Sequence, residues 1–488
     1  MEKKMKRKIK INETGKNRSI LFICLPSTLD VFKESKISVA VPLIPLISLA
    51  QLSAVAKKQG YKPYVLDLSV KKKESVKERI TNAIKGINPE YCGITFTTPL
   101  SKEGDSVAAF VKKIDKSVKT IAGGAHATIM PKEALASRNF DLVVIGEGEN
   151  TLKELLSGKD IRKIDGIGFR TKNGKGKIVI NKPRELIKNL DDLPMPDYSV
   201  FDIHSYHTPR LNCRKNPVAA METSRGCPFG CIYCNKKIFG RFFRYKSPKR
   251  VVDEMEHILS YGFKEIHIWD DGFSTDLKRA KDVCREILRR KLKITWNIYN
   301  GIRANRIDRE LLELLKKSGC YRISIGVESG NQKILDRIHK STTIEEIKKA
   351  FKLANEVGIE TIAFCMIGLP DETEETMQQT IDLMLEIRPT IPKLSILMPL
   401  PGTPIFDEWD KKGIITSKFW PNYVFHLPQK VYNHPTLDWE TINKYYKLFY
   451  RKTMLNPGFL FRRVIRDIRT GELFWDAYYF IKTLKWGW

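Results

Sequence analysis

The stretch Glu222-Thr-Ser-Arg-Gly-Cys227-Pro-Phe-Gly-Cys231-Ile-Tyr-Cys234-Asn235 contains three cysteines in the spacing CxxxCxxC. Three thiolates this close together in one loop can ligate three irons of a cubane 4Fe–4S cluster, which leaves the fourth iron without a protein ligand. An open iron can hold and activate a substrate, whereas a cluster bound by four cysteines serves electron transfer. The glycines and the proline of this stretch let the backbone wrap closely around a bulky inorganic core. The spacing therefore predicts a cluster with one open iron.

Two other kinds of cysteine site compete with this interpretation. A structural zinc site normally takes four Cys or His ligands in paired groups, but Cys213 is solitary upstream and His257 lies well downstream. A disulfide framework is disfavoured because the chain has nine cysteines, an odd number, and no signal peptide that would direct it to an oxidising compartment. The cysteines therefore favour the open cluster over zinc or structural thiols.

The composition is that of an ordinary globular protein with an unusual charge. The 488 residues suffice for two or three domains, and the hydrophobic fraction of 42% is typical. With 85 Lys and Arg residues against 56 Asp and Glu residues, the net charge is +29. Such an excess predicts attraction to an anionic partner, such as nucleic acid, phospholipid headgroups or a phosphorylated substrate.

The basic N-terminal segment, residues 1–18, is not followed by a long apolar run, so secretion is not indicated. The most apolar stretch, residues 38–56, carries Pro42 and Pro45 and then continues into polar residues. A buried helix of an α/β domain explains this stretch better than a membrane span does. We therefore expect a cytoplasmic protein.

Short apolar runs alternate with helical patterns from residue 19 to about residue 160. The strand candidates are residues 20–24, 64–68, 91–96, 120–122 and 142–145, and the helix candidates are residues 43–59, 72–86, 102–117 and 149–157. This alternation predicts a doubly wound, Rossmann-like parallel sheet. Ligands of such sheets bind at the carboxyl ends of the strands, where the loops carry the chemistry.

Glycine-rich loops follow several of these strands. The loop residues that we single out are Thr98, Gly123, Gly124, His126, Gly146 and Glu147. A pair of glycines after a strand allows a backbone to approach a large ligand closely, although such pairs are more often plain turns. A connector of residues 161–212, with an expected hairpin around 172–176, separates this domain from the next.

A second series of strands and helices starts near residue 213 and reaches about residue 435. Its strand candidates are residues 218–223, 265–269, 294–299, 322–325, 360–366 and 393–397, with helices near 248–260, 275–290, 308–318, 343–356 and 373–387. Six such units predict a partial (βα)6 barrel, and parallel barrels have their active sites at the carboxyl ends of the strands. The cysteine loop follows the first of these strands, as this placement requires.

The cysteine loop resembles the signature of the radical S-adenosylmethionine (SAM) enzymes, and Tyr233 matches the aromatic residue usually found before the third cysteine. In that superfamily SAM chelates the open iron, and an electron from the cluster splits SAM to give a 5′-deoxyadenosyl radical. The resemblance implies SAM contacts at further strand ends. Asp270 and Asp271 would face the amino group, Arg303 the carboxylate, Glu328 the ribose, and the segment beginning at Gly368 the adenine.

The first domain, residues 19–160, resembles the cobalamin-binding domain that precedes the radical SAM core in one large subfamily. The loops that carry this likeness are Gly123 to His126 and Gly146 to Glu149. The DxHxxG motif of many cobalamin proteins is absent after the first strand, so no residue is assigned to the lower face of cobalt. His126 is read as a loop histidine that makes hydrogen bonds.

The C-terminal region, residues 436–488, combines basic and aromatic residues. Residues 441–488 include ten Lys and Arg, three Asp and Glu, and thirteen aromatic residues. Apolar residues with a basic face fit a helix lying on an anionic membrane surface, but they also fit a helical cap that closes the barrel. Both interpretations remain open from the sequence. Binding of nucleic acid is less favoured because no RNA-binding module is visible.

The resemblance implies an enzyme that uses a 4Fe–4S cluster, SAM and cobalamin. The favoured hypothesis is methylation of an unactivated carbon on a hydrophobic substrate such as a lipid, with a reductant protein of the flavodoxin or ferredoxin type. One alternative is a cobalamin-dependent cyclase or oxidative enzyme without methyl transfer. An alternative of another class is an iron–sulfur electron carrier. If the C-terminal region binds a membrane, it would bring the enzyme to the inner face of that membrane.

Overall fold

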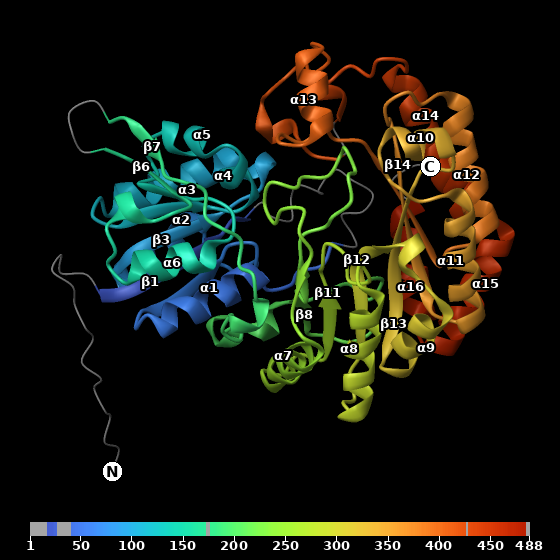
Figure 1. The fold of residues 1–488 in the computed structure, drawn as a ribbon, viewed down its shortest axis with the longest axis horizontal. Helices are drawn as coiled ribbons and strands as arrows, with labels where there is room; N and C mark the ends of the chain where they lie inside the picture. Colours follow the sequence, from blue (N-terminus) through green and yellow to red (C-terminus); the bar gives the residue numbers. More distant parts are fainter. Residues whose placement is uncertain (1–16, 27–40, 172–175, 426–427, 485–488) are drawn as a thin grey trace. The chain divides into compact units, whose positions relative to one another are not determined.

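The structure is a computed structural model that describes residues 17–26, 41–171, 176–425 and 428–484 (Figure 1). It divides into two compact units. The first contains strand β1 with Ser48–Ile187 and Pro194–Asp202, and the second contains Lys188–Leu193 and the chain from Ile203 onward. The expected turn at 172–175 and nearly all of the basic N-terminal segment lie outside the described residues, and the domain boundaries stay predictions.

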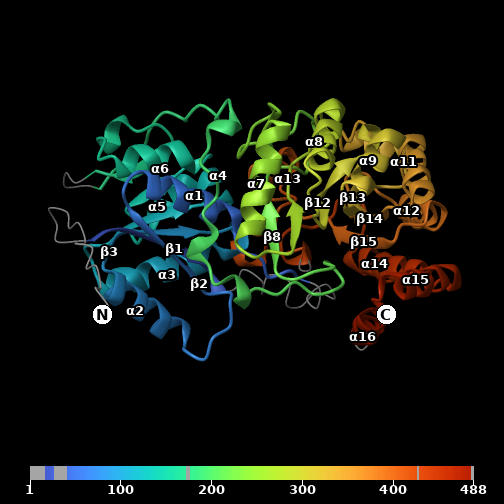
Figure 2. The ribbon, with the colours of Figure 1, turned by 90° about the horizontal axis from the view of Figure 1, so that it is seen from below.

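A parallel sheet forms the centre of the first unit, as the alternation of apolar runs predicted. Its parallel strands are β1 (Asn17–Cys24), β2 (Lys62–Asp67), β3 (Pro89–Thr95), β4 (Lys119–Gly123) and β5 (Leu142–Val144), in the order β2-β1-β3-β4-β5. Its main helices are α1 (Ile47–Lys58), α2 (Val76–Ile87), α3 (Ser101–Ile114) and α6 (Gly148–Leu156). Figure 2 shows α1 and α6 on one face of the sheet and α2 and α3 on the other, which confirms the doubly wound fold.

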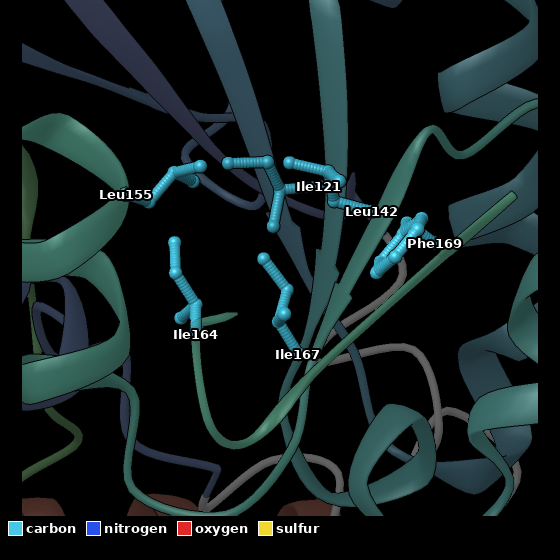
Figure 3. Packing of buried hydrophobic residues seen from close by; sticks show 6 residues of the cluster. All are labelled: Ile121, Leu142, Leu155, Ile164, Ile167 and Phe169. Carbon is cyan, nitrogen blue, oxygen red and sulfur yellow. The ribbon is translucent and has the colours of Figure 1, made fainter. Parts of the chain in front are cut away.

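Two antiparallel strands extend this sheet beyond β5. They are β6 (Ile167–Arg170) and β7 (Ile178–Ile180), and Leu142 of β5 pairs with Phe169 of β6. Ile167 and Phe169 of β6 pack in one core cluster with apolar side chains of β4, β5, α6 and the turn before β6 (Figure 3): Ile121, Leu142, Leu155 and Ile164. Part of the segment expected as a connector therefore belongs to the first unit, because its apolar residues complete that core.

The second unit contains six parallel strands that form the predicted partial barrel. In sheet order they are β15 (Ile391–Ile396), β14 (Glu360–Ile367), β13 (Cys320–Glu328), β12 (Trp296–Arg303), β11 (Glu265–Ile268) and β8 (Val218–Met221). The helices between them are α7 (Pro248–Ser260), α8 (Leu277–Arg289), α9 (Arg309–Lys317), α10 (Gln332–Arg337), α11 (Ile344–Val357) and α12 (Glu374–Ile387). The sequence patterns did not predict α10, which has only six residues.

Helices follow the barrel at the C-terminal end of the chain: α13 (Pro404–Lys411), α14 (Trp439–Met454), α15 (Pro457–Thr470) and α16 (Leu473–Leu484). The helix α14 packs on the edge strand β15, where the Tyr450 hydroxyl donates to Leu394 O and accepts from Leu394 N, both at 3.1 Å. These bonds satisfy backbone groups at an otherwise open sheet edge. The prediction of a helical C-terminal region is confirmed. No helix among the described residues is long and apolar enough to cross a membrane.

Gly330 allows the loop after β13 to touch helix α12 directly. Its N–H donates to Thr380 Oγ1 at 2.8 Å, and an added Cβ would lie 2.3 Å from the backbone oxygen of Gln379. We expect Gly330→Ala to destabilise the protein by about 1–3 kcal/mol, because the helix backbone has to move away. Urea denaturation followed by circular dichroism measures this loss.

Gly86 in α2 is the matched control, because nothing lies within 4 Å of its added Cβ. Gly86→Ala should leave stability unchanged or raise it by up to about 1 kcal/mol through helix propensity. Equal stability of Gly330→Ala and the unmodified protein would contradict the proposed close contact.

Candidate functional site

Two short antiparallel strands pair the two ends of the cysteine loop. They are β9 (Ser224–Arg225) and β10 (Arg244–Tyr245). The loop between them follows the carboxyl end of β8 and contains all three cysteines.

The buried carboxylate of Asp270 holds the start of this loop. It accepts four hydrogen bonds from the backbone and hydroxyl groups of Thr223 and Ser224; those from Ser224 N and Oγ measure 3.1 Å and 2.7 Å. Both oxygens are used, and a carboxylate held by several donors is strongly fixed. Asp270 follows β11, so it ties the end of one strand to the loop of its neighbour. It does not line the cavity of the cysteines, which leaves Asp271 as the predicted partner of the SAM amino group.

Asp271 fixes the next residues of the same loop. Its carboxylate accepts a hydrogen bond from Gly226 N at 3.0 Å and lines the cavity. Burial raises the pKa of Asp271, although the Gly226 N–H lowers it. Gly226 has φ +79°, and a Cβ there would lie 2.3 Å from the backbone oxygen of Phe242, so only glycine fits this turn.

Most of the predicted residues of the second unit line one cavity. They are Cys227, Cys231, Tyr233, Cys234, Asp271, Arg303 and Glu328, whereas Asp270 and Gly368 lie outside it. Within the described ranges, no three Cys, His, Asp or Glu side chains converge as the ligands of a single ion do. The three thiols instead share the cavity wall.

Lys236 lies beside the three cysteines and also lines the cavity. Burial lowers the pKa of Lys236, but the charges of Cys234, Cys227 and Cys231 outweigh it and raise the pKa overall. A cation at this place suits a group that carries the negative charge of three thiolates. Three cysteines on one cavity wall with a neighbouring lysine fit a 4Fe–4S cluster with one open iron.

Glu328 and Lys340 form a buried ion pair at the opposite wall, with 2.6 Å between Lys340 Nζ and Glu328 Oε1. Glu328 has φ +69°, and His339 and Ser341 on either side of Lys340 have φ +54° and +51°. Such left-handed conformations cost free energy in residues other than glycine, and they concentrate at functional sites. The pair therefore holds two strained segments together at the cavity.

Arg303 connects the cysteine loop to the segment of Lys340. Its guanidinium donates to the backbone oxygens of Lys340 and Ser341, and it lies 3.7 Å from the centre of the Phe229 ring. Arg303 Nη1 is also 3.9 Å from Cys231 Sγ. The arginine thus connects the cysteine loop to the segment of Lys340, and its predicted contact with the SAM carboxylate stays a prediction.

Tyr233 and Gly368 take different positions relative to the cavity. Burial raises the pKa of Tyr233, and the Glu328 carboxylate adds to this rise, so the phenol of Tyr233 stays protonated.

Gly368 has φ +71°, and an added Cβ would lie 3.5 Å from the Tyr432 hydroxyl. Behind it, burial raises the pKa of Glu372 to about 8, although this carboxylate accepts a hydrogen bond from Leu369 N. The predicted contacts of Tyr233 and Gly368 with SAM stay predictions.

Several polar residues of this cavity were not found from the sequence, among them Lys236, Asn300 and Lys340. Asn300 belongs to β12 close to its carboxyl end, so its position in a parallel barrel was a usable signal. Lys340 follows the short helix α10. No pattern in the sequence brings it to Glu328, because this contact depends on the strained backbone of both segments.

In the first unit, the predicted loop residues gather at the carboxyl ends of β3, β4 and β5. The imidazole Nδ1 of His126 lies 3.4 Å from Thr98 Oγ1, and Gly146 N donates to Thr128 Oγ1 at 3.0 Å. Glu147 is buried and accepts a hydrogen bond from Ile187 N at 2.7 Å. These contacts join three neighbouring loops at one edge of the sheet.

His126 is buried, and its contact with Thr98 Oγ1 agrees with the prediction of a histidine that makes hydrogen bonds. Burial lowers the pKa of His126 to about 4, so its imidazole is neutral at physiological pH. Gly124 beside it has φ +92°, and a Cβ there would lie 2.8 Å from the backbone oxygen of Phe96. Gly123 and Gly146 have no heavy atom closer than 4.0 Å to their added Cβ. This open glycine backbone fits the approach of a large planar ligand such as cobalamin.

Two known families match the chain. The Radical SAM superfamily matches residues 221–384, and the B12 binding domain matches residues 37–156. The first range contains the three cysteines and most of the barrel strands. The second range contains the glycine-rich loops of the first unit.

Relatives in other organisms are similar over most of both chains. An uncharacterized methyltransferase of Pyrococcus horikoshii is 31% identical, over 80% of this chain and 86% of that protein. The anaerobic magnesium-protoporphyrin IX monomethyl ester cyclase of Rubrivivax gelatinosus is 28% identical, over 84% of this chain and 75% of that protein.

Solved structures share the fold of both units. The radical SAM methyltransferase TsrM of Kitasatospora setae has a TM-score of 0.68 at 22% identity, covering 82% of this chain and 78% of that one. The cobalamin-dependent SAM radical enzyme OxsB has a TM-score of 0.70 at 18% identity, covering 88% and 66%. At these identities the likeness establishes the arrangement of strands and helices.

We expect Asp270→Asn to impair assembly of the cluster. An asparagine amide can accept hydrogen bonds at only one of its two terminal atoms, so half of the bonds from Thr223 and Ser224 are lost. This change should cost about 2–3 kcal/mol of stability and lower the iron and sulfide content after anaerobic reconstitution. Asp382→Asn on the exposed face of α12 is the control. An unchanged iron content in Asp270→Asn would show that the loop does not depend on this carboxylate.

Proposed function

Because the chain belongs to the radical SAM enzymes that carry a B12-binding domain, we propose that it methylates an unactivated carbon of a hydrophobic substrate. The cofactors of this enzyme are a 4Fe–4S cluster, SAM and cobalamin. When bound, the cluster with SAM supplies hydrogen abstraction, and cobalamin supplies the methyl group. The name of the Pyrococcus horikoshii relative, a methyltransferase similar over most of both chains, supports the transfer of a methyl group.

The cavity of the three cysteines carries this proposal. Cys227, Cys231 and Cys234 would hold the cluster, while Asp270 and Asp271 fix the loop in place. Tyr233, Asp271, Arg303 and Glu328 offer polar groups of both charges to a zwitterionic ligand such as SAM. These groups bind and orient, whereas the cofactors supply the difficult chemistry.

The aromatic side chains of the barrel would exclude water from the reaction. Phe364 of β14 and Phe239 line the cavity together with the cysteines. Exclusion of water protects a reactive intermediate from side reactions. An electron must also reach the cluster from outside the chain. We propose a reductant protein of the flavodoxin or ferredoxin type, and the net charge of +29 suits a partner with an anionic surface.

A ring-forming reaction without methyl transfer is the second candidate. It is supported by the similarity to the Rubrivivax gelatinosus cyclase, which at 28% identity is nearly as close as the methyltransferase at 31%. The two reactions differ in the fate of the methyl group of SAM. Isotope labelling therefore distinguishes them.

We expect methyl-deuterated SAM to label the product. The protein is reconstituted with cluster and cobalamin and incubated with a reductant and a solvent extract of cells that lack this gene. Mass spectrometry should find 5′-deoxyadenosine and one extracted compound that gains the deuterated methyl group. Formation of 5′-deoxyadenosine with an altered but unlabelled product would replace methyl transfer with the cyclase hypothesis.

Cys227→Ala should abolish both products, because the cluster loses one of its three predicted ligands. The matched control is Cys284→Ala, since Cys284 is buried in α8 outside the cysteine loop. It should retain both products. Full activity of Cys227→Ala would refute the assignment of the cluster.

A further inference from the structure

Lys393 of β15 points into the interior of the barrel. Its Nζ lies 5.5 Å from the centre of the Tyr299 ring on β12 and 5.8 Å from that of Phe364 on β14. In the sheet, β14 and β13 stand between β15 and β12, so Lys393 reaches Tyr299 only across the concave inner face. Phe364 also lines the cavity of the cysteines. The lysine and that cavity therefore share the barrel interior.

This lysine has no anionic partner among the described residues. The buried lysines Lys246 and Lys340 of the second unit are paired: Lys246 Nζ lies 2.8 Å from Glu254, and Lys340 Nζ lies 2.6 Å from Glu328. Lys393 is partly buried, and withdrawing an ammonium from water without a counter-charge is costly. Burial lowers the pKa of Lys393 to about 8, and the positive charge of Arg322 adds to this effect.

The charged and titratable groups around this interior are already engaged with one another. Arg322 of β13 is 2.6 Å from Glu360 of β14, and His267 of β11 is 2.8 Å from Glu265. Burial lowers the pKa of His267, so this ring adds no fixed positive charge. Of the charged side chains named here, and within the described residues, the amine of Lys393 is the one without a partner of opposite charge.

Stacked aromatic rings form the wall opposite Lys393. The rings of His267 and Tyr299 have centres 5.3 Å apart with an angle of 9° between their planes, and those of Trp269 and Tyr299 are 5.6 Å apart with an angle of 14°. Trp269 remains 38% exposed at the carboxyl end of β11. This wall offers apolar, flat surface to a ring or an apolar body.

We propose that Lys393 binds an anionic group of the substrate, a carboxylate or a phosphate, while the apolar body of the substrate lies on Trp269 and Tyr299. This names the substrate class of the proposed methyl transfer and rests on it. An ammonium enclosed by protein forms a strong, charge-assisted hydrogen bond to an anion. The aromatic wall then selects a substrate that is apolar next to its charge.

Binding of small probes tests the subsite without turnover. The probes are 2-naphthoate, 2-naphthyl phosphate and the neutral 2-naphthylmethanol, added to the protein loaded with cluster and cobalamin. We expect the two anions to bind at least about tenfold more tightly than the alcohol, as expected for a hydrogen bond to a charged group. Their affinity should fall above about pH 8, where Lys393 loses its proton. The anion that binds more tightly shows whether the subsite prefers a carboxylate or a phosphate.

Variants show whether Lys393 itself is responsible. Lys393→Met should remove the preference for anions, Lys393→Arg should keep it, and the surface variant Lys352→Met should behave as the unmodified protein. A preference for anions that survives in Lys393→Met would overturn the proposal, and so would equal binding of all three probes to the unmodified protein.

Two further measurements distinguish failure of the Lys393 proposal from failure of the proposed methyl transfer. Cleavage of SAM and incorporation of label from methyl-deuterated SAM test the methyl transfer by themselves. Amine labelling over a range of pH, followed by mass spectrometry, tests the titration directly. Labelling of Lys393 should increase as the pH passes about 8, where its amine loses its proton, and 2-naphthoate should protect it.

A second, independent feature lies on the helices α15 and α16, below the second sheet in Figure 2. Large apolar side chains lie exposed along them: Phe461, Val464, Ile468, Leu473, Phe474, Trp475, Tyr478 and Ile481. Phe461 is 68% exposed, Ile468 65% and Phe474 73%. The spacing of three, four or seven residues puts most of them on one stripe of each helix.

The acidic residues of this region are instead paired with arginines of α15. Arg463 donates two hydrogen bonds to Asp476, and Arg466 donates to Asp467 and lies 3.6 Å from Glu472. These three acidic residues are all those of residues 441–488, so the outer face has none. Arg462 and Arg469 are exposed beside the apolar stripe of α15.

We propose that this apolar and basic face docks on an anionic membrane surface. A helical pair in water normally buries its apolar side chains and exposes its charges, and α15 and α16 have the opposite arrangement. Apolar residues flanked by arginines match the acyl chains and anionic headgroups of a lipid interface. A cap that packed on the barrel through these apolar side chains would bury them, whereas here they are exposed.

Co-sedimentation with vesicles tests this face. We expect the full protein to bind vesicles that contain phosphatidylglycerol and to bind pure phosphatidylcholine vesicles at least about tenfold less, with weaker binding at high salt. Phe461→Ser with Phe474→Ser should abolish binding. Phe419→Ser is the control, since Phe419 is 46% exposed but lies outside α15 and α16.

Sedimentation velocity of the same variants tests a second copy of the chain as the occupant. A dimer that dissociates in the Phe461→Ser, Phe474→Ser double variant, without vesicle binding by the unmodified protein, would overturn the proposal. Equal binding to both kinds of vesicle would also overturn it, because the arginines would then have no role.

Discussion

The candidate site depends on one buried carboxylate, that of Asp270. It stands at the end of β11 and accepts hydrogen bonds from Thr223 and Ser224 at the end of the neighbouring strand. These bonds fix the position of the cysteine loop relative to the sheet, so the loop does not depend on its own internal contacts alone. Asp271 and Gly226 continue this connection along the chain. A loop rich in glycine has high conformational entropy, so such fixed points are needed before three thiols can present one geometry.

Another part of the cavity lining has a strained backbone that needs side-chain contacts to stay in place. Glu328 and the residues around Lys340 have left-handed backbones, and a buried ion pair with the bonds of Arg303 keeps them in place. The regular strands and helices of the barrel stabilise the fold enough to offset the free-energy cost of these left-handed backbone conformations. Lys340 and Lys246 are paired with carboxylates, whereas Lys393 of the same unit has no carboxylate partner in the part of the chain that the structure describes. A lysine with a structural role has a carboxylate beside it in the fold. We infer a ligand-binding role for a lysine in the protein interior that has none.

The strand and helix pattern of both units was predictable because each βα unit is long and periodic. The six barrel strands and five of their helices occur where apolar periodicity placed them. The roles of single residues were less predictable. Asp270 matched a strand-end position, but only the structure shows that its oxygens face Thr223 and Ser224. Lys340 and Lys393 were not found, because their neighbours are distant in sequence and no local pattern encodes an ion pair or its absence. The antiparallel strands β6 and β7 were read as part of a connector, since a short hairpin does not reveal which sheet edge it joins.

The two inferred surfaces of the second unit are chemically consistent with each other. In the barrel interior, the ammonium of Lys393 faces an aromatic wall, and on the outer face of α15 and α16 arginines lie beside exposed apolar side chains. Both arrangements favour a molecule with an anionic group and an apolar body. Such an amphiphile concentrates at a lipid interface because its apolar part leaves water while its charge stays solvated. An enzyme that docks on this interface meets its substrate at a raised local concentration. The excess of basic residues then serves the same purpose as the lysine inside the barrel: it attracts an anionic partner.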